Sequence, residues 1–478
     1  MACILELRGN ADADLQEVLR EGVRQLVGVL ASHDRTLPYF VTREFEAYLG
    51  CRDPKQGFAW LECAPCEHHR CVLFSCKTRG FCPSCLGRRM NEKAAHWVDR
   101  VIPWAATRQF VLTVPWPRRF LLARRPDLAD GVLQVALRCI ARFYRRATGR
   151  RAGQSGSVTA IQRFGSALQL NLHFHVIHLD GVYDRGADGS LRFFHAAPRT
   201  ADVEALVERV GVRCERWLAA RGFAGEAEDS NPGDGDDADD ALGVMQQASL
   251  AQQVATERRP VKKVKRTQVL GGKERALGPN CASYDGYNLH AGVHLDAMDR
   301  AGLERLCRYV LRPPLALPRL ERFQGVDGRT MVRIEMKRTY SDGTHAIELS
   351  ALGLAEKLAA IVPPPRANTV IYSGVLAANA ALRPDVIPKA PTSTDAEQAA
   401  REARKLKRRD GPTPSLRAQL ALSWADLLQR VFRVDGWECP RCKKPMSLRT
   451  VVIGVPACTR ILHGLQNAAG PPVGDSAA

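Results

Sequence analysis

The segment from residue 170 to residue 183 constrains the fold most strongly, because it is apolar, alternating and rich in β-forming residues. Such a pattern predicts a buried β-strand. Side chains two positions apart on a strand project from the same face, so His173 and His175 would point together while Phe174 packs the other way. Two imidazoles on one rigid strand can bind a divalent metal; the alternative is a pair of hydrogen-bonded core histidines.

Length and charge narrow the class of protein. The chain has 478 residues and a formal net charge of +18, from 69 Lys and Arg against 51 Asp and Glu. We expect roughly two to four domains. The basic excess favours a polyanionic partner, with nucleic acid ahead of an anionic membrane surface. The N-terminal residues lack a signal-peptide pattern and no apolar stretch could span a bilayer, so we expect a cytoplasmic, nucleoid-associated protein with no membrane partner.

Cysteine spacing predicts a zinc site. The chain has 15 cysteines and no secretion signal, which favours metal binding over disulfides. Two Cys-x-x-Cys pairs, Cys63 with Cys66 and Cys82 with Cys85, have the spacing of one structural Zn²⁺ held by four thiolates. Residues between the pairs could shift the assignment or bind a second ion: His68, His69, Cys71 and Cys76. Basic residues surround the cluster and could dock DNA, although the module could also be a purely structural clip: Lys77, Arg79, Arg88 and Arg89.

A third Cys-x-x-Cys pair lies near the C-terminus. Cys439 and Cys442 form half of a zinc ribbon, and Cys458 and His463 could complete it. The sequence therefore leaves room for a second Zn²⁺ in this part of the chain.

Periodicity and composition divide the chain. Residues 1–100 form a helical and zinc-binding DNA-docking domain, with a helix at 11–32. Residues 101–365 form the central domain, in which an acidic and then basic run at 224–268 predicts a disordered insertion. A linker region at 366–415 and a smaller, mostly helical C-terminal module at 416–478 follow. The central strands and helices are expected at these positions: strands 108–114, 158–164, 168–183, 329–338 and 345–349; helices 130–148, 301–311 and 352–361.

One tyrosine has a chemically informative setting. Tyr309 lies on the predicted helix 301–311, between Arg308 and Arg312. Tyrosine is a weak nucleophile at neutral pH, since the phenol has a reference pKa of about 10. Neighbouring cations and a metal-polarised phosphate can offset this. By itself, however, the pattern also fits a helix-face tyrosine whose hydroxyl meets solvent.

The combination of these motifs resembles the HUH single-strand endonucleases, and more closely the rolling-circle transposases of the insertion-sequence-91 (IS91) family. The resemblance runs nearly end to end and rests on five segments: 75–85, 171–181, 303–314, 342–349 and 423–432. Some members carry a second tyrosine four residues after the first, but position 313 here is proline. The chain therefore resembles the single-tyrosine type.

The resemblance implies an α+β fold with a central antiparallel sheet of the HUH type, preceded by the zinc-binding module and followed by the C-terminal module. It implies a transposase that nicks and joins single-stranded DNA at the element's ends and in the target. By this analogy His173 and His175 hold Mg²⁺ or Mn²⁺, and Tyr309 attacks to form a 5′-phosphotyrosine link. A third metal ligand is expected, for which His290 is the candidate; it could instead be a core histidine, or His294 could take the role. His178 should face the opposite side of the strand.

Other functions fit less of the sequence. A plasmid or phage rolling-circle replication initiator would share the chemistry but leave the zinc module and the region beyond residue 330 unexplained. A zinc-dependent DNA-binding regulator would make the histidines structural. A metal hydrolase of small molecules would leave the charge unexplained. No G-x4-G-K-[S/T] loop is present, so DNA unwinding would need a host helicase. Stacking of single-stranded bases would use exposed aromatic side chains, with Trp104, Trp116 and Tyr183 as candidates.

Overall fold

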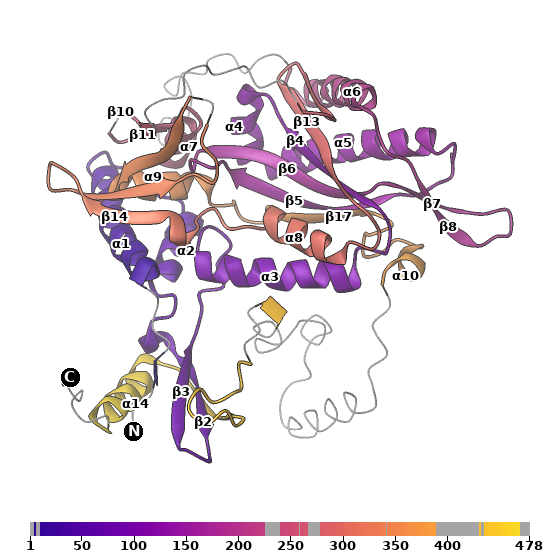
Figure 1. The fold of residues 1–478 in the computed structure, drawn as a ribbon. Coiled ribbons are helices and arrows are strands. Elements are labelled where there is room, and N and C mark those ends of the chain that lie inside the picture. The colour runs from indigo at the N-terminus through magenta and orange to yellow at the C-terminus, as the bar shows by residue number, and fades with distance from the viewer. Residues whose placement is uncertain are drawn as a thin grey trace.

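A six-stranded antiparallel sheet organises the centre of the molecule in the computed structural model (Figure 1). The structure describes residues 4–5, 10–224, 240–257, 259–265, 278–340, 342–388, 430–431 and 435–468. The strand order is β12-β13-β4-β6-β5-β17, and every neighbouring pair is antiparallel. The strands have these bounds: β4 Thr107–Thr113, β5 Gly156–Phe164, β6 Leu170–Leu179, β12 Cys281–Tyr284, β13 Tyr287–Leu295 and β17 Val370–Gly374.

Helices cover both faces of this sheet. Apolar stripes of α4 (Trp116–Arg124), α5 (Pro126–Ala147) and α6 (Thr200–Ala219) pack against one face, with Phe174 of β6 in that core. Those of α3 (Pro83–Arg100) and α8 (Arg300–Val310) pack against the other, with Ile177 of β6 in that core. The two faces of β6 thus meet different cores, as the alternation of its side chains requires.

The histidine side chains of β6 lie on different faces of the sheet. His173, His175 and Ile177 lie on the side of α3 and α8, whereas His178 stacks on Tyr144 with ring centroids 5.2 Å apart. The prediction that His178 faces away from the pair is confirmed.

A buried ion pair holds the opposite face together. Arg108 on β4 donates two hydrogen bonds, both of 2.8 Å, to the carboxylate of Asp180, and a third to the carbonyl oxygen of Ala291. Tyr144 donates to the same carboxylate at 2.5 Å, and Asp180 is completely buried. Burial and the adjacent carboxylate raise the pKa of Tyr144 well above its usual value.

We expect Asp180→Ala to lower the free energy of unfolding by about 3–5 kcal/mol, because it leaves the Arg108 guanidinium buried without its counter-charge. Urea denaturation followed by circular dichroism measures the change. Asp188→Ala, which breaks an exposed ion pair with Arg192, is the matched control and should change stability by about 1 kcal/mol or less. Equal effects of the two substitutions would contradict this account.

A second, four-stranded sheet lies beside the first, in the order β11-β16-β15-β14 (β11 Lys262–Lys265, β14 Leu320–Gln324, β15 Thr330–Glu335, β16 Thr344–Ser350). It shares one apolar core with α1 (Asn10–Ala31), α2 (Tyr39–Leu49), α7 (Ala241–Leu250) and α9 (Ala351–Ile361). Gly22 of α1 permits the close approach of α9, because a Cβ there would lie 2.1 Å from the carbonyl oxygen of Ala351.

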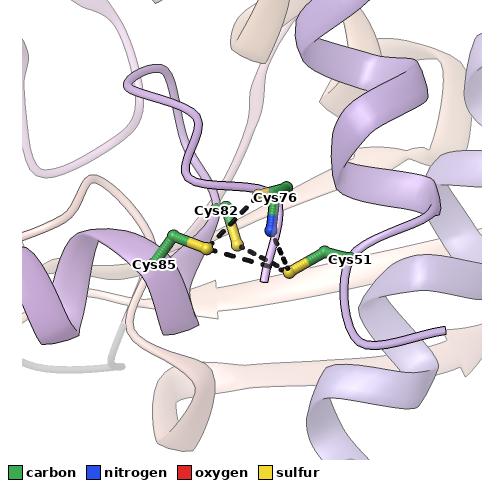
Figure 2. A group of neighbouring side chains, drawn as sticks. All are labelled: Cys51, Cys76, Cys82 and Cys85. Atoms are coloured by element: carbon green, nitrogen blue, oxygen red, sulfur yellow. Dashed lines mark hydrogen bonds between the residues drawn. The ribbon is translucent and has the colours of Figure 1, made fainter. Parts of the chain in front are cut away.

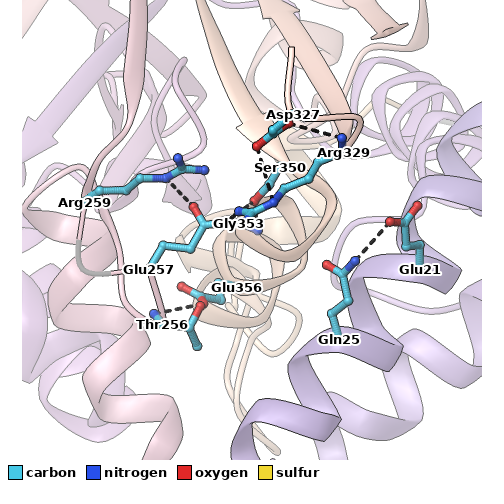
Figure 3. Close-up of polar contacts among 10 residues, drawn as sticks. All are labelled: Glu21, Gln25, Thr256, Glu257, Arg259, Asp327, Arg329, Ser350, Gly353 and Glu356. Atoms are coloured by element: carbon cyan, nitrogen blue, oxygen red, sulfur yellow. Dashed lines mark hydrogen bonds and ion pairs between the residues drawn. The ribbon is translucent and has the colours of Figure 1, made fainter. Parts of the chain in front are cut away.

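The predicted disordered insertion 224–268 is ordered in its described parts. Besides α7 and β11 it contains β9 (Gln253–Val254) and β10 (Arg259–Pro260), while residues 225–239, 258 and 266–268 lie outside the described part. Figure 3 shows two of its contacts around α9: the backbone N–H of Thr256 donates to Glu356, and Ser350 donates to Glu257. The backbone N–H of Ala255 also donates to Glu356. The prediction was wrong here because the apolar stretch 241–250 packs in the core despite its charged flanks.

The N-terminal module contains the third sheet, β1-β3-β2-β18 (β1 Ile4–Leu5, β2 Phe58–Cys63, β3 His68–Leu73, β18 Ser447–Val452). Because β18 pairs with β2, the described C-terminal segment 435–468 joins the sheet of the N-terminal module. Residues 389–429 of the predicted linker and C-terminal module lie outside the described part.

The remaining elements are short or peripheral. They are η1 (Pro54–Gln56), the hairpin β7 (Gly181–Arg185) and β8 (Leu191–His195), η3 (Leu317–Arg319), α10 (Arg383–Val386) and α14 (Val455–Ala468). The predicted strand 168–183 is thus two strands, β6 and β7, while β17 and α10 occupy the start of the predicted linker. Within the described residues, no helix has both the length and the apolar character that a membrane crossing requires.

Candidate functional site

His173 and His175 face each other on β6. Their Nε2 atoms are 3.1 Å apart, and the two residues are 7 % and 3 % exposed. Burial lowers the pKa of His173 to about 4 and that of His175 well below its usual value, with the charge of Arg312 acting in the same direction. Both rings are therefore neutral at pH 7, which is the form that binds metal ions.

Hydrogen bonds to the outer nitrogens orient the rings. His173 Nδ1 lies 2.9 Å from the carbonyl oxygen of Asn171, so Nδ1 carries the proton and Nε2 has a free lone pair. His175 Nδ1 lies 2.9 Å from the side-chain amide of Gln109 on β4. A glutamine amide can donate or, turned over, accept, so Gln109 can stabilise either tautomer of His175. In the second tautomer both Nε2 lone pairs point into the gap between the rings, as metal ligation requires.

Tyr309 of α8 lies against this pair. Its ring centroid is 5.8 Å from that of His175, with an angle of 81° between the ring planes. The residue is 39 % exposed, although its neighbours Cys307 and Val310 are buried in the core beneath α8. The amphipathic helix therefore anchors one face in the core and holds the tyrosine at the edge of the site, where a large substrate can reach it.

Cations surround the tyrosine. The guanidinium of Arg312 lies 4.5 Å from the Tyr309 ring centroid, and Lys337 Nζ lies 4.8 Å from it. Arg119 and Arg312 both act electrostatically on His173. Arg308, which is also predicted to contact DNA, forms an ion pair with Glu304, and Glu304 also binds Arg430. The positive charge at this site thus comes from Arg312, which was predicted, and from Arg119 and Lys337, which were not.

The structure does not bring His290 to the pair. His290 on β13 is in register with Val111 on β4, which in turn is in register with His175 on β6. Two strand spacings, roughly 10 Å, therefore separate the backbones of His290 and His175. His290 Nδ1 contacts the sulfur of Cys281 at 3.0 Å. Among the described residues, no third His, Cys, Asp or Glu gathers with the histidine pair.

Gln162 is the polar neighbour that sequence reasoning missed. It lies on β5 in direct register with His173, is 5 % exposed, and donates a 2.7 Å hydrogen bond to the carbonyl oxygen of Val310 on α8. Its buried Oε1 has no hydrogen-bond partner. A buried amide oxygen without a partner is costly, so a ligand of the site is the natural partner for it. No sequence motif marks a glutamine whose role comes from strand register.

The cysteines form two clusters, each with four sulfurs lying within 4.8 Å of one another. The first unites Cys51, Cys76, Cys82 and Cys85 (Figure 2). The sulfur of Cys51 lies 3.8 Å from those of Cys82 and Cys85, and the sulfurs of Cys76 and Cys85 are 3.3 Å apart. The second unites Cys63, Cys66, Cys439 and Cys442, with sulfur distances of 3.4 Å from Cys63 to Cys442 and 3.6 Å from Cys66 to Cys439. Zn–S bonds of 2.3 Å in a tetrahedron place the sulfurs about 3.8 Å apart, so both clusters have the size of a zinc site.

This arrangement corrects the expected pairing of the cysteines. The predicted set of Cys63, Cys66, Cys82 and Cys85 is divided between the clusters, because β2 and β3 carry the first pair away from the start of α3. Cys458, the expected partner of Cys439 and Cys442, is instead buried in an apolar cluster with Phe58.

Backbone conformation supports the clusters. The residue after Cys51, Cys66, Cys76 and Cys442 has a positive φ in each case, between 52° and 61°: Arg52, Glu67, Lys77 and Lys443. Four non-glycine residues in this sparsely populated conformation mark tight turns that fold the chain back at a sulfur. In addition, the backbone N–H of Cys76 donates a hydrogen bond to the sulfur of Cys51.

Comparison with known families agrees with this architecture. Residues 23–114 match the family described as "Transposase zinc-binding domain", and residues 156–383 match the family described as "Putative transposase". No curated protein and no solved structure matches the chain. The first match contains all six N-terminal cysteines of the two clusters, and the second contains the histidine pair and Tyr309. The zinc-binding match and the geometry of the clusters together support structural Zn²⁺. The chain belongs to the IS91 family of transposases and acts on DNA.

Proposed function

We propose that this transposase cuts and rejoins single-stranded DNA by a rolling-circle mechanism, through a covalent bond between Tyr309 and a 5′-phosphate. The contact between Tyr309 and His175 is the observation that carries the proposal, because it places a phenol beside a neutral imidazole pair. Since these residues come from α8 and β6, 134 positions apart in the chain (309 − 175), only the fold unites them.

The residues present fit a divalent cation. His173 and His175 would hold it through Nε2, and Gln162 Oε1 would supply an oxygen ligand in place of the predicted His290. The amide oxygen, together with phosphate oxygens of the DNA, would suit Mg²⁺ or Mn²⁺. The two imidazole nitrogens would favour Mn²⁺ over Mg²⁺, because Mg²⁺ prefers oxygen ligands. When bound, the ion would polarise the scissile phosphate and neutralise charge that develops on it.

The chain's own groups would perform the remaining steps. The phenolic oxygen of Tyr309 forms a bond to phosphorus and gives up its proton, while the bond from phosphorus to the 3′ oxygen breaks and that oxygen takes up a proton. One phosphodiester replaces another, so the joining reaction, in which a 3′-hydroxyl of the target attacks the link, needs no ATP. Arg312 and Lys337, which lie beside the Tyr309 ring, would bind the flanking phosphates.

Basic residues of the zinc module would guide the strand to the site. Arg79 and Arg89 lie close to the end of α8, since both line the same cavity as Arg312. Lys77 and Arg88, also predicted to bind DNA, are exposed nearby on the same module. The exposed indoles of Trp104 and Trp116 offer surfaces for base stacking. A host helicase would supply the single strand.

The proposal predicts a metal-dependent covalent adduct. Single-stranded DNA that carries the element's end should form a protein–DNA adduct on a denaturing gel with Mg²⁺ or Mn²⁺, and omission of both ions should abolish it. His175→Ala should reduce the adduct more than about 10²-fold, because ligand substitution weakens metal binding and charge stabilisation together.

His178→Ala is the control for the loss of a buried β6 histidine, since His178 lies on the opposite face of the sheet. It should retain the adduct if the protein folds. A protein that binds the DNA but forms no adduct under any of these conditions would be a DNA-binding regulator, and the proposal would fail.

A further inference from the structure

A cavity of about 120 Å³ lies where α3, the end of α8 and the edge of β5 meet. It is on the order of ten times the space that one water molecule needs. Gln162 and Val310 contribute to its wall, so the cavity adjoins the histidine pair and the tyrosine helix. The register of β5 and β6 shifts between Gln162 and Phe164, and such irregularities re-aim side chains next to functional sites.

The cavity has an excess of positive charge. Its lining contains five basic residues and one acidic residue: Arg79, Arg89, Lys93, Arg163, Arg312 and Asp130. The carboxylate of Asp130 accepts a hydrogen bond from Asn368 at 2.8 Å. The wall therefore attracts an anion.

Arg163 is the most unusual of these residues. It is 7 % exposed, and among the described residues no carboxylate forms an ion pair with it. Its Nε and Nη1 donate to the carbonyl oxygens of Ile361 and Ala123, whereas its buried Nη2 has no partner. A buried guanidinium without a counter-charge is costly, which indicates that an anionic ligand completes its surroundings.

Most of the remaining lining is apolar and includes Leu122, Leu172 and Ile361. An inorganic anion would leave this surface unused, whereas a nucleotide combines a flat, largely apolar base with a phosphate. We infer that the cavity binds one nucleotide of the DNA strand next to the scissile phosphate, with its base against the apolar wall and its phosphate at Arg163 and Arg89. This inference rests on the proposed function and adds a recognition pocket to it.

The inference can be tested without DNA cleavage. The full-length Tyr309→Phe chain, with no added Mg²⁺ or Mn²⁺, is titrated calorimetrically with thymidine 5′-monophosphate, thymidine or inorganic phosphate. The monophosphate should bind at least about tenfold more tightly than either fragment, because only it fills both parts of the cavity. Equal affinity for inorganic phosphate would reveal a simple anion site, and equal affinity for thymidine would reveal an apolar site; either result overturns the inference.

Substitutions in the lining of the cavity test whether the monophosphate binds there. Arg163→Met and Arg89→Ala should each weaken monophosphate binding by about 10- to 100-fold, since each removes a hydrogen bond to a charged group. Arg100→Ala, at the far end of α3 and outside the cavity, is the matched control and should bind normally. If Arg163→Met fails to fold, Arg89→Ala decides, and unchanged binding in that variant overturns the inference.

The monophosphate-binding test and the adduct assay can fail independently of each other. If the wild-type protein forms the covalent adduct but the Tyr309→Phe variant binds no monophosphate, the proposed function stands and the proposed nucleotide pocket is refuted. If the Tyr309→Phe variant binds the monophosphate but the wild-type protein forms no adduct, the nucleotide pocket stands and the proposed function is refuted.

Discussion

Tyr309→Phe should eliminate the covalent protein–DNA adduct, with a loss of more than about 10³-fold in strand cleavage. The substitution removes only the phenolic oxygen, which is the atom that would bond to phosphorus. The ring, its edge contact with His175 and its contacts with Arg312 and Lys337 would remain. Binding of single-stranded DNA, measured by fluorescence anisotropy, should therefore change little while the adduct disappears from the denaturing gel.

Tyr284→Phe is the matched control, because Tyr284 is exposed to a similar degree, 38 % against 39 %, but lies at the far edge strand of the sheet. It should leave the adduct intact. An adduct that survives in Tyr309→Phe would assign the nucleophile to another residue and would remove the basis of the proposed reaction.

The chain should bind two Zn²⁺ ions, and Cys439→Ser combined with Cys442→Ser should reduce the number to one. Structural zinc sites of four thiolates contribute about 10–16 kcal/mol of apparent binding free energy, so the loss of an ion should be accompanied by local unfolding. We expect segment 435–468 to detach from β2 and to become sensitive to proteases, because β18 and the second cluster hold it there. Plasma emission spectrometry counts the ions, and limited proteolysis reports the detachment.

Loss of two cysteines from the first cluster should have a wider effect on stability. Cys82→Ser combined with Cys85→Ser should also leave one ion but should destabilise a larger part of the protein, since both residues lie in the core shared by α1, α2 and α9. Cys281→Ser removes a cysteine outside both clusters and should retain two ions. A wild-type content of one ion per chain would contradict the two-cluster structure and would favour the single site expected from the sequence.

Local pattern was enough to predict the elements that carry the candidate site. Alternation in β6 placed His173 and His175 together and His178 on the opposite face, because strand geometry fixes the direction of each side chain. The apolar spacing of residues 301–311 predicted the helix that presents Tyr309. The contact between tyrosine and histidine was expected only by resemblance to a family, since no local pattern joins β6 to α8.

Features that depend on long-range pairing were missed or misassigned. His290 has the right chemistry, but strand order places β4 between it and the histidine pair, and register instead brings Gln162 beside His173. Charge along 224–268 suggested disorder, whereas contacts with α9 order its described parts.

The sequence by itself determined which residues can bind metal and which strand or helix carries them, because side-chain chemistry and helix or strand periodicity are local properties. Only the tertiary structure decided which of them meet. Cys63 is 3 positions from Cys66 and 376 positions (439 − 63) from Cys439, yet all three lie in one cluster, while Cys82 lies in the other. A tetrahedral site needs four sulfurs close in space, and the pairing of β2 with β18, which no spacing along the chain encodes, brings them together.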